Sequence, residues 1–202
     1  SDYIDFTYDK GVEDAMKCYD YLAALGTIDM EHVGIMGWSQ GGTDALLAAE
    51  AHPGTFQAVV TWSGALELNG ASLFAGTSFE DAYAQAKKEG FYTMTFDWRE
   101  PLELGERWFQ EVAETNILKV TADIKAPILA INGKDDTTVT PDNAEKIVKA
   151  AANADSQLLL VDNCDHTYNV FSGDFTALYQ TVDATAAFFQ AQLIPAAAQA
   201  AA

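Results

Sequence analysis

Four short apolar runs without polar alternation constrain the fold of this chain most strongly. They lie at residues 33–36, 58–62, 128–132 and 158–161. Runs of this kind are typical of strands that are buried on both faces, as in a parallel sheet covered by helices. Helical patterns lie between and around them, so strands and helices alternate along the chain. This order predicts an α/β fold with a mostly parallel sheet joined by right-handed crossovers.

Apolar residues at helical spacing predict the flanking helices. These helices are expected at residues 10–25, 41–51, 141–152 and 175–193. Gly26 ends the first helix, and Thr140 with Pro141 supplies an N-cap and a first turn for the third. The last helix should direct Leu178, Val182 and Phe189 inward.

Residues 67–125 differ from the rest of the chain, since they lack strand signals and are rich in aromatic side chains. The segment is too long for an ordinary connection, so we expect a helical insertion lying over one end of the sheet. Most of its aromatic side chains are expected to form the insertion's own core. We therefore expect one domain over residues 1–194, followed by an alanine-rich tail at 195–202.

Charge and composition exclude several kinds of partner. The chain has 30 acidic and 11 basic residues and a net charge of -19, which should repel nucleic acid and anionic lipid surfaces. A solubilising surface explains this charge without any function. No apolar stretch approaches the roughly 20 residues of a membrane span, and the two cysteines are too few for a disulfide framework or a zinc cluster. We expect a cytoplasmic protein.

The motif Gly37-Trp38-Ser39-Gln40-Gly41 follows a predicted strand and opens a predicted helix. A serine on such a tight turn adopts a strained backbone that leaves no room for side chains two positions away, hence Gly37 and Gly41. The hydroxyl is then exposed above the carboxyl ends of the strands. The helix directs its first N–H groups to the same place, and the Gln40 N–H is nearest to a developing oxyanion. The motif predicts Ser39 as a nucleophile, the alternative being a plain turn.

A nucleophilic serine needs a base to take its proton. The chain has three histidines. His32 precedes the first strand, at the end opposite Ser39, and His52 lies in the turn after the nucleophile's helix, so both are expected at the surface. His166 follows the fourth strand, at the same end of the sheet as Ser39. It is therefore the candidate base.

The acid that orients the histidine should follow the third strand, where Asp135 and Asp136 are both available. The spacing from Gly133 favours Asp136, which leaves Asp135 as a solvated neighbour. Asp162 and Asp165 flank His166 but are close to it in sequence, so we expect them to shape its loop.

Three segments carry a family resemblance. DMEHVGIMGWSQGG, IKAPILAINGKDDTTVTP and LLLVDNCDHTYN resemble the nucleophile, acid and histidine segments of α/β-hydrolase-fold serine esterases. Residues 1 to about 193 are most similar to small bacterial carboxylesterases of the cinnamoyl or feruloyl esterase type. The resemblance implies Ser39, Asp136 and His166 as the catalytic triad, the Gln40 backbone as an oxyanion donor, and no metal or organic cofactor.

The resemblance also implies an activity and a substrate site. It implies hydrolysis of small carboxylic esters through an acyl-enzyme, with the aromatic insertion as a lid that forms the acyl pocket. Trp38, Trp98 and Trp108 are the candidates for contact with substrate. A triad does not choose between water and other acceptors, so a peptidase or an acyltransferase is the alternative enzyme. A binding fragment without catalysis is the alternative outside enzymes.

The pattern departs from the family at its beginning. Nothing in residues 1–30 matches the early strands or the loop that gives relatives a second oxyanion donor, so about the first third of the usual domain is expected to be absent from this chain. The strand at 33–36 would then lie at an unpaired, apolar edge. We expect a second chain, another copy of this chain or further native sequence to complete the sheet.

Overall fold

A central sheet of four parallel strands organises the molecule. The computed structural model describes residues 3–70, 73–74, 76–96 and 99–194. The strands are β1 (Gly34–Trp38), β2 (Ala58–Trp62), β5 (Ile128–Gly133) and β6 (Gln157–Val161). They are paired in the order β1-β2-β5-β6, and every pairing is parallel. The expected parallel α/β sheet is therefore confirmed.

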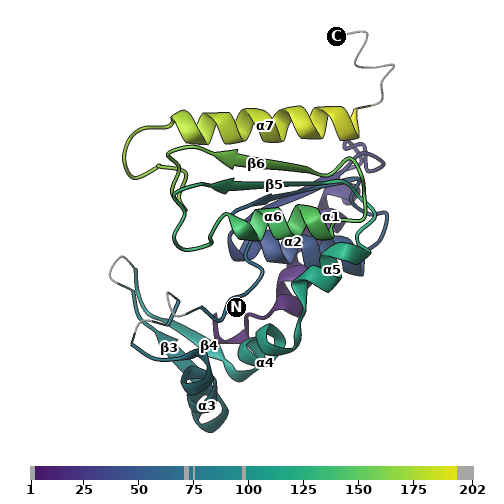
Figure 1. The fold of residues 1–202 in the computed structure, drawn as a ribbon. Coiled ribbons are helices and arrows are strands. Elements are labelled where there is room, and N and C mark those ends of the chain that lie inside the picture. The colour runs from purple at the N-terminus through teal and green to yellow at the C-terminus, as the bar shows by residue number, and fades with distance from the viewer. Residues whose placement is uncertain (1–2, 71–72, 75, 97–98, 195–202) are drawn as a thin grey trace.

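Helices cover both faces of this sheet. They are α1 (Tyr8–Ala24), α2 (Gln40–Ala51), α5 (Ile117–Asp123), α6 (Asp142–Ala150) and α7 (Thr176–Leu193), preceded by the short 3-10 helix η1 (Tyr3–Asp5). In Figure 1, α7 lies on one face and the other α-helices lie on the opposite one. Val60 and Ile131 pack with Phe188 of α7, whereas the neighbouring Val59 packs with Leu46 on the α2 side. The strands are therefore apolar on both faces because both faces are covered.

The buried stripe of α7 differs from the prediction. It consists of Ala177, Thr181, Thr185 and Phe188. Leu178 and Phe189 pack against this stripe as expected, but Val182 is 43% exposed, so its inward placement was wrong. The Thr185 hydroxyl accepts a hydrogen bond from Trp62 Nε1 at 2.9 Å, which lets a polar residue take an inward position. In the part of the chain that the structure describes, no helix is both long and apolar enough to cross a bilayer.

The insertion contains a β-hairpin as well as helices. Its elements before α5 are α3 (Phe79–Glu89), β3 (Phe91–Met94), β4 (Leu102–Gly105) and α4 (Glu106–Glu114). β3 and β4 pair antiparallel and project from the main body at the lower end of Figure 1. The expectation of a purely helical insertion was therefore wrong. Gly90, with φ 90°, ends α3, and the aromatic and β-branched residues that follow it favour a strand.

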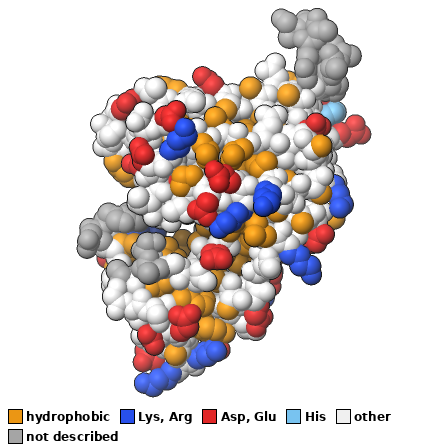
Figure 2. All heavy atoms as spheres, viewed as in Figure 1, with side chains coloured by type: hydrophobic (Ala, Val, Ile, Leu, Met, Phe, Trp, Pro, Cys, Tyr) orange, Lys and Arg blue, Asp and Glu red, His pale blue; other side chains and the backbone are white. Residues whose placement is uncertain are grey.

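An aromatic cluster forms the core of the insertion, as the sequence predicted. Phe74, Phe79, Trp108 and Phe109 are all at least 92% buried. The rings of Trp108 and Phe109 meet edge to face, with 5.0 Å between their centroids. Acidic side chains are spread over both the main body and the insertion in Figure 2, which is consistent with a solubilising charge.

β1 lies at one edge of the sheet, as expected. Its backbone bonds to β2 on one side, where the Ser39 N–H that follows the strand donates to Trp62 O at 2.8 Å. Because backbone groups alternate in direction, those of Gly34, Met36 and Trp38 face away from β2. The side chains of Met36 and Trp38 are 45% and 48% exposed. The edge therefore offers both unpaired backbone groups and apolar surface.

We expect the isolated chain to associate through this edge. Light scattering should give a mass above the 21.8 kDa of one chain, and added salt should raise it by screening the like charges. Met36→Lys should lower the mass, because a charge at an edge opposes strand pairing. Leu158→Lys, on the opposite edge strand β6, is the matched control. A wild-type chain that stays monomeric at every salt concentration would contradict the expectation.

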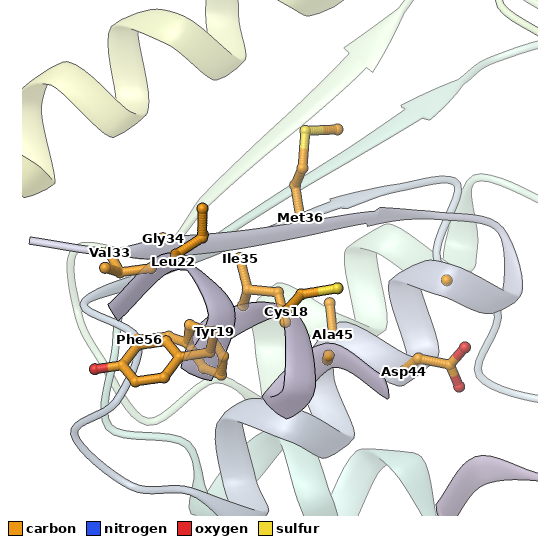
Figure 3. A pocket seen from close by; sticks show the side chains of 12 residues that line it. Cys18, Tyr19, Leu22, Val33, Gly34, Ile35, Met36, Asp44, Ala45 and Phe56 are labelled. Carbon is orange, nitrogen blue, oxygen red and sulfur yellow. The ribbon is translucent and has the colours of Figure 1, made fainter. Parts of the chain in front are cut away.

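A groove of about 270 Å³ lies between α1 and β1 (Figure 3). Apolar side chains form most of its wall, and Asp44 of α2 lies toward one end of it. The Oδ1 atom of Asp44 is buried and accepts no hydrogen bond from the described residues. A Cβ atom on Gly11 would lie 2.9 Å from the carboxyl carbon, so α1 packs closely over this group. Burial raises the pKa of Asp44 to about 7.

Asp44→Asn should stabilise the fold at pH 8 and have little effect at pH 4. In the unfolded chain the Asp44 pKa is near 4, so this carboxyl ionises in the unfolded state at a lower pH than in the folded state. Between pH 4 and about 7 this difference increasingly stabilises the unfolded state, and above about pH 7 the effect is constant. The free energy of unfolding should rise by up to about 4 kcal/mol at pH 8. Urea titrations at both pH values measure it, with Asp20→Asn on the exposed side of α1 as the control. Equal gains at both pH values would argue against this origin.

Candidate active site

Ser39 lies on the turn between β1 and α2 in a positive-φ conformation, with φ 56° and ψ -124°. This is an uncommon conformation for a residue with a side chain and stores strain in the turn. The backbone on either side is fixed, because Ser39 N donates to Trp62 O and Ser39 O accepts from Gly42 N at 2.9 Å. A Cβ atom at Gly37 would lie 1.9 Å from Gly41 O, so only glycine fits there. The strained serine turn predicted from the motif is present.

The reason given for Gly41 was wrong. A Cβ atom at Gly41 would meet no described atom within 4 Å, although its carbonyl oxygen is the one that excludes a side chain at Gly37. Gly42 is the crowded position instead, since a Cβ there would lie 2.8 Å from Gly64 Cα. Gly64 follows β2, so this requirement comes from a part of the chain that the motif does not include.

The structure brings Ser39, His166 and Asp136 together. His166 Nε2 lies 3.1 Å from Ser39 Oγ, and His166 Nδ1 lies 2.8 Å from Asp136 Oδ2. The imidazole is 16% exposed and the carboxylate is fully buried. The three side chains follow β1, β5 and β6, whose carboxyl ends share one rim of the sheet. The arrangement can pass a proton from the hydroxyl to the imidazole, with the carboxylate holding the other ring nitrogen.

Asp136 is held as an ionised acceptor. Its Oδ1 accepts from Thr138 N at 2.9 Å and Val139 N at 2.8 Å, and Asn132 Nδ2 lies 3.4 Å from Oδ2. Burial raises the pKa of Asp136, but the hydrogen bonds from His166 and Val139 lower it more, so this pKa lies below its usual range. Asp135 is exposed, so of the two open candidates only Asp136 meets His166.

The loop that carries His166 is organised by its own side chains. Asp165 Oδ1 accepts hydrogen bonds from Thr167 N at 2.8 Å and Asn169 N at 2.9 Å. Asp162 forms an ion pair with Lys134 at 2.6 Å. Both aspartates therefore shape the surroundings of the histidine, as expected, and neither replaces Asp136 at the imidazole.

Trp38 makes a contact that the sequence did not predict. Its indole Nε1 donates to the backbone carbonyl of His166 at 3.0 Å, and the two rings are tilted with centroids 5.3 Å apart. The indole thus ties the end of β1 to the histidine loop. It remains half exposed beside the imidazole, which also leaves apolar surface next to the hydroxyl.

Trp108, which was also proposed for substrate contact, is placed differently from Trp38. Trp108 is 2% exposed and packs inside the aromatic core of the insertion, so the structure does not place it on an open surface. Its aromatic neighbours bury it, which a count of aromatic residues in a lid segment cannot reveal. Trp98 lies outside the described residues.

Asn132 is a supporting residue that the sequence analysis missed. It is fully buried in β5, and its Nδ2 donates to Val139 O at 2.9 Å, close to the acid. A single polar residue at the end of an otherwise apolar strand was the available signal. Asn132 therefore links the end of β5 to the turn that holds Asp136.

The remaining two histidines lie outside this arrangement. His32 Nδ1 contacts Asp29 at 2.7 Å, and His52 follows the last residue of α2. Both are partly buried rather than fully exposed. Within the described ranges, no three His, Cys, Asp or Glu side chains gather in a way that could hold a metal ion.

Solved structures with the same fold include enzymes of several activities. Est1E from Butyrivibrio proteoclasticus with ferulic acid bound is 19% identical with a TM-score of 0.74, and the match covers 95% of this chain and 71% of that one. The metagenome-derived lipolytic enzymes LipS and LipT give 19% and 0.68, covering 93% and 75%. A puromycin-hydrolyzing peptidase of Mycobacterium tuberculosis gives 22% and 0.65, covering 91% and 25%.

These likenesses establish the α/β-hydrolase fold, which the sequence resemblance implied. The sequence also matches a family model. Residues 7–194 match the sequence model of the prolyl oligopeptidase family, which is nearly the whole chain. The chain therefore belongs to the prolyl oligopeptidase family, a family of hydrolases.

Proposed function

We propose that this chain is a serine esterase that cleaves small carboxylic esters through an acyl-enzyme. The observation that carries the proposal is the continuous pair of hydrogen bonds from Ser39 to His166 and from His166 to Asp136, at 3.1 and 2.8 Å. A serine hydroxyl is inert without such a base, and a base needs its tautomer fixed. A nucleophilic role for Ser39 explains why a strained serine lies beside an oriented imidazole.

The reaction proceeds in two halves. His166 Nε2 takes the proton as Ser39 Oγ attacks the ester carbonyl, and the oxyanion lies at the start of α2. Gln40 is the first residue of α2, so its N–H lacks an acceptor within the helix and can donate to the oxyanion. The alcohol leaves with the proton from His166. Water then gives a proton to His166 and attacks the acyl carbon, and as the intermediate collapses His166 returns this proton to Ser39 Oγ and the acid is released.

Aromatic surface beside the hydroxyl supports an apolar or aryl substrate. Trp38 is 48% exposed and adjoins His166, so we assign it to substrate contact as well as to the histidine loop. The Est1E structure holds ferulic acid, an aryl acid, on the same fold.

One oxyanion donor limits the expected rate. Removal of a single donor from such a site typically lowers turnover by about 10² to 10³. Gln40 is the donor assigned here, so the isolated chain should bind substrate but hydrolyse it slowly, because both acylation and deacylation pass through an oxyanion. The family resemblance implies a second donor on a loop after an early strand, which would come from the segment that completes the β1 edge.

Ser39→Ala tests the nucleophile. Hydrolysis of a p-nitrophenyl ester should fall by about 10⁶, or to background, because no other group replaces the attacking oxygen. Labelling by a fluorophosphonate should disappear as well. Ser172→Ala removes an exposed hydroxyl in the histidine loop and is the matched control. Labelling that persists in Ser39→Ala would remove this residue from the role.

A peptidase is the second candidate, favoured by the family and by the peptidase among the structural neighbours. The triad itself does not distinguish an ester from an amide. We expect kcat/KM for a p-nitrophenyl ester to exceed that for the matching aminoacyl p-nitroanilide. The reverse order would assign the chain to peptide hydrolysis, and a chain that a fluorophosphonate does not label would be a binding module.

A further inference from the structure

Two buried hydroxyl groups meet behind the Ser39, His166 and Asp136 side chains. Ser63 follows β2 and is fully buried, and Tyr168 lies in the histidine loop and is 2% exposed. Their oxygen atoms are 3.3 Å apart. Neither residue touches open solvent, so neither can contact substrate directly. Their effect on the site must pass through the side chains that they hold.

Both residues have left-handed backbones, with φ 46° at Ser63 and 55° at Tyr168. Each such conformation costs about 1 to 3 kcal/mol for a residue with a side chain and persists only where its surroundings demand it. The positions are fixed from both sides. Ser63 N donates to Ile131 O at 2.7 Å, and Tyr168 N donates to Asp165 O at 3.1 Å. The strain therefore directs two hydroxyl groups toward each other at the rim of the sheet.

Tyr168 anchors the histidine loop to the sheet. It stands two residues after His166, and its ring packs against Trp62 of β2 with centroids 5.1 Å apart. Its hydroxyl can donate to Ser63 Oγ at 3.3 Å or to Ile131 O at 3.4 Å. A carbonyl oxygen can accept two hydrogen bonds, so Ile131 O can accept from Tyr168 as well as from Ser63 N. Burial raises the Tyr168 pKa above its usual range, which keeps the hydroxyl protonated.

Ser63 connects this anchor to the strand that carries the acid. Its N–H donates to Ile131 O at 2.7 Å, and the Tyr168 hydroxyl lies 3.4 Å from the same oxygen. Ile131 belongs to β5, the strand that leads to Asp136. The Ser63 hydroxyl is also one of the groups that lower the pKa of Asp136, after His166 and Val139. Contacts at the ends of β2 and β5 therefore link the loop of the base to the strand that carries the acid.

We propose that Ser63 and Tyr168 are positioning residues that fix Asp136 and His166 relative to each other. The acid follows β5 and the base follows β6, so each is carried by its own loop. The end of β2 can hold both of these loops in place. The inference rests on the proposed function for its kinetic consequence, although the contact between Asp136 and His166 can be measured without it.

Three variants test the pair. Ser63→Ala removes the hydroxyl and keeps the strain, Ser63→Gly removes both, and Tyr168→Phe removes only the second hydroxyl. For each we expect kcat to fall by about 10-fold to 100-fold with KM unchanged, because misplacement of a buried group affects chemistry more than binding. Ser63→Gly should be more stable than Ser63→Ala and equally slow. Tyr179→Phe, which alters an exposed ring on α7, should match wild type.

A proton resonance separates positioning from folding. The His166 Nδ1–H shared with Asp136 should give a downfield ¹H signal in wild type that Asp136→Asn abolishes. The three variants should weaken or shift this signal while their circular dichroism stays native. The double variant Ser63→Ala/Tyr168→Phe should be no slower than either single variant, since the two hydroxyls act as one unit.

Several results would overturn the inference. One such result is a wild-type kcat in Ser63→Gly. Another is an unchanged signal in the variants, with an activity that falls only as far as the folded fraction falls. Either result would show that the hydroxyls do not position the site. Absence of the signal in wild type would remove the contact that they are inferred to support. If wild type has the signal but Ser39 is neither labelled nor active, the proposed function fails, and the signal in the variants still decides this inference.

Discussion

The parallel direction of β1, β5 and β6 is the constraint on which the site depends. Parallel strands place all of their carboxyl ends at one rim, so side chains that are 127 residues apart in sequence can meet there. The helices on both faces keep the sheet in place, and they also explain why the strands are apolar throughout. Ser39, Asp136 and His166 each follow a strand by a few residues, which gives their loops little freedom.

Strain at the rim is the second common feature. Ser39, Ser63 and Tyr168 all have positive φ; Ser63 Oγ contacts the Tyr168 hydroxyl, and Ser39 Oγ contacts His166. Packing of the sheet against α7 can carry this cost, and Tyr168 itself belongs to the apolar cluster on the α7 side. Strain of this kind lowers stability and fixes the conformation at one place, as is common at functional sites.

The sequence predicted the parts of the structure that local pattern controls. Apolar runs gave the four strands of the sheet within one or two residues, and the serine motif with its downstream Asp136 and His166 located the rim. The prediction from the sequence was wrong where a contact between residues distant in the chain determines the local structure. Thr185 lies inward because Trp62 needs an acceptor, Gly42 is crowded by Gly64, and the β3 and β4 hairpin was hidden among aromatic residues assigned to a core. Ser63 had no local signal at all.

The exposed side of β1 bears on how the molecule loses order. Ser39 stands at the end of a strand that is hydrogen-bonded along one side, whereas Asp136 follows a strand that is bonded along both. Local opening costs least where fewest bonds are broken, so β1 separates from β2 at a lower free energy than β5 leaves the interior. Warming would therefore displace Ser39 while most of the domain is still native, and the activity proposed for Ser39 would be lost before the domain melts.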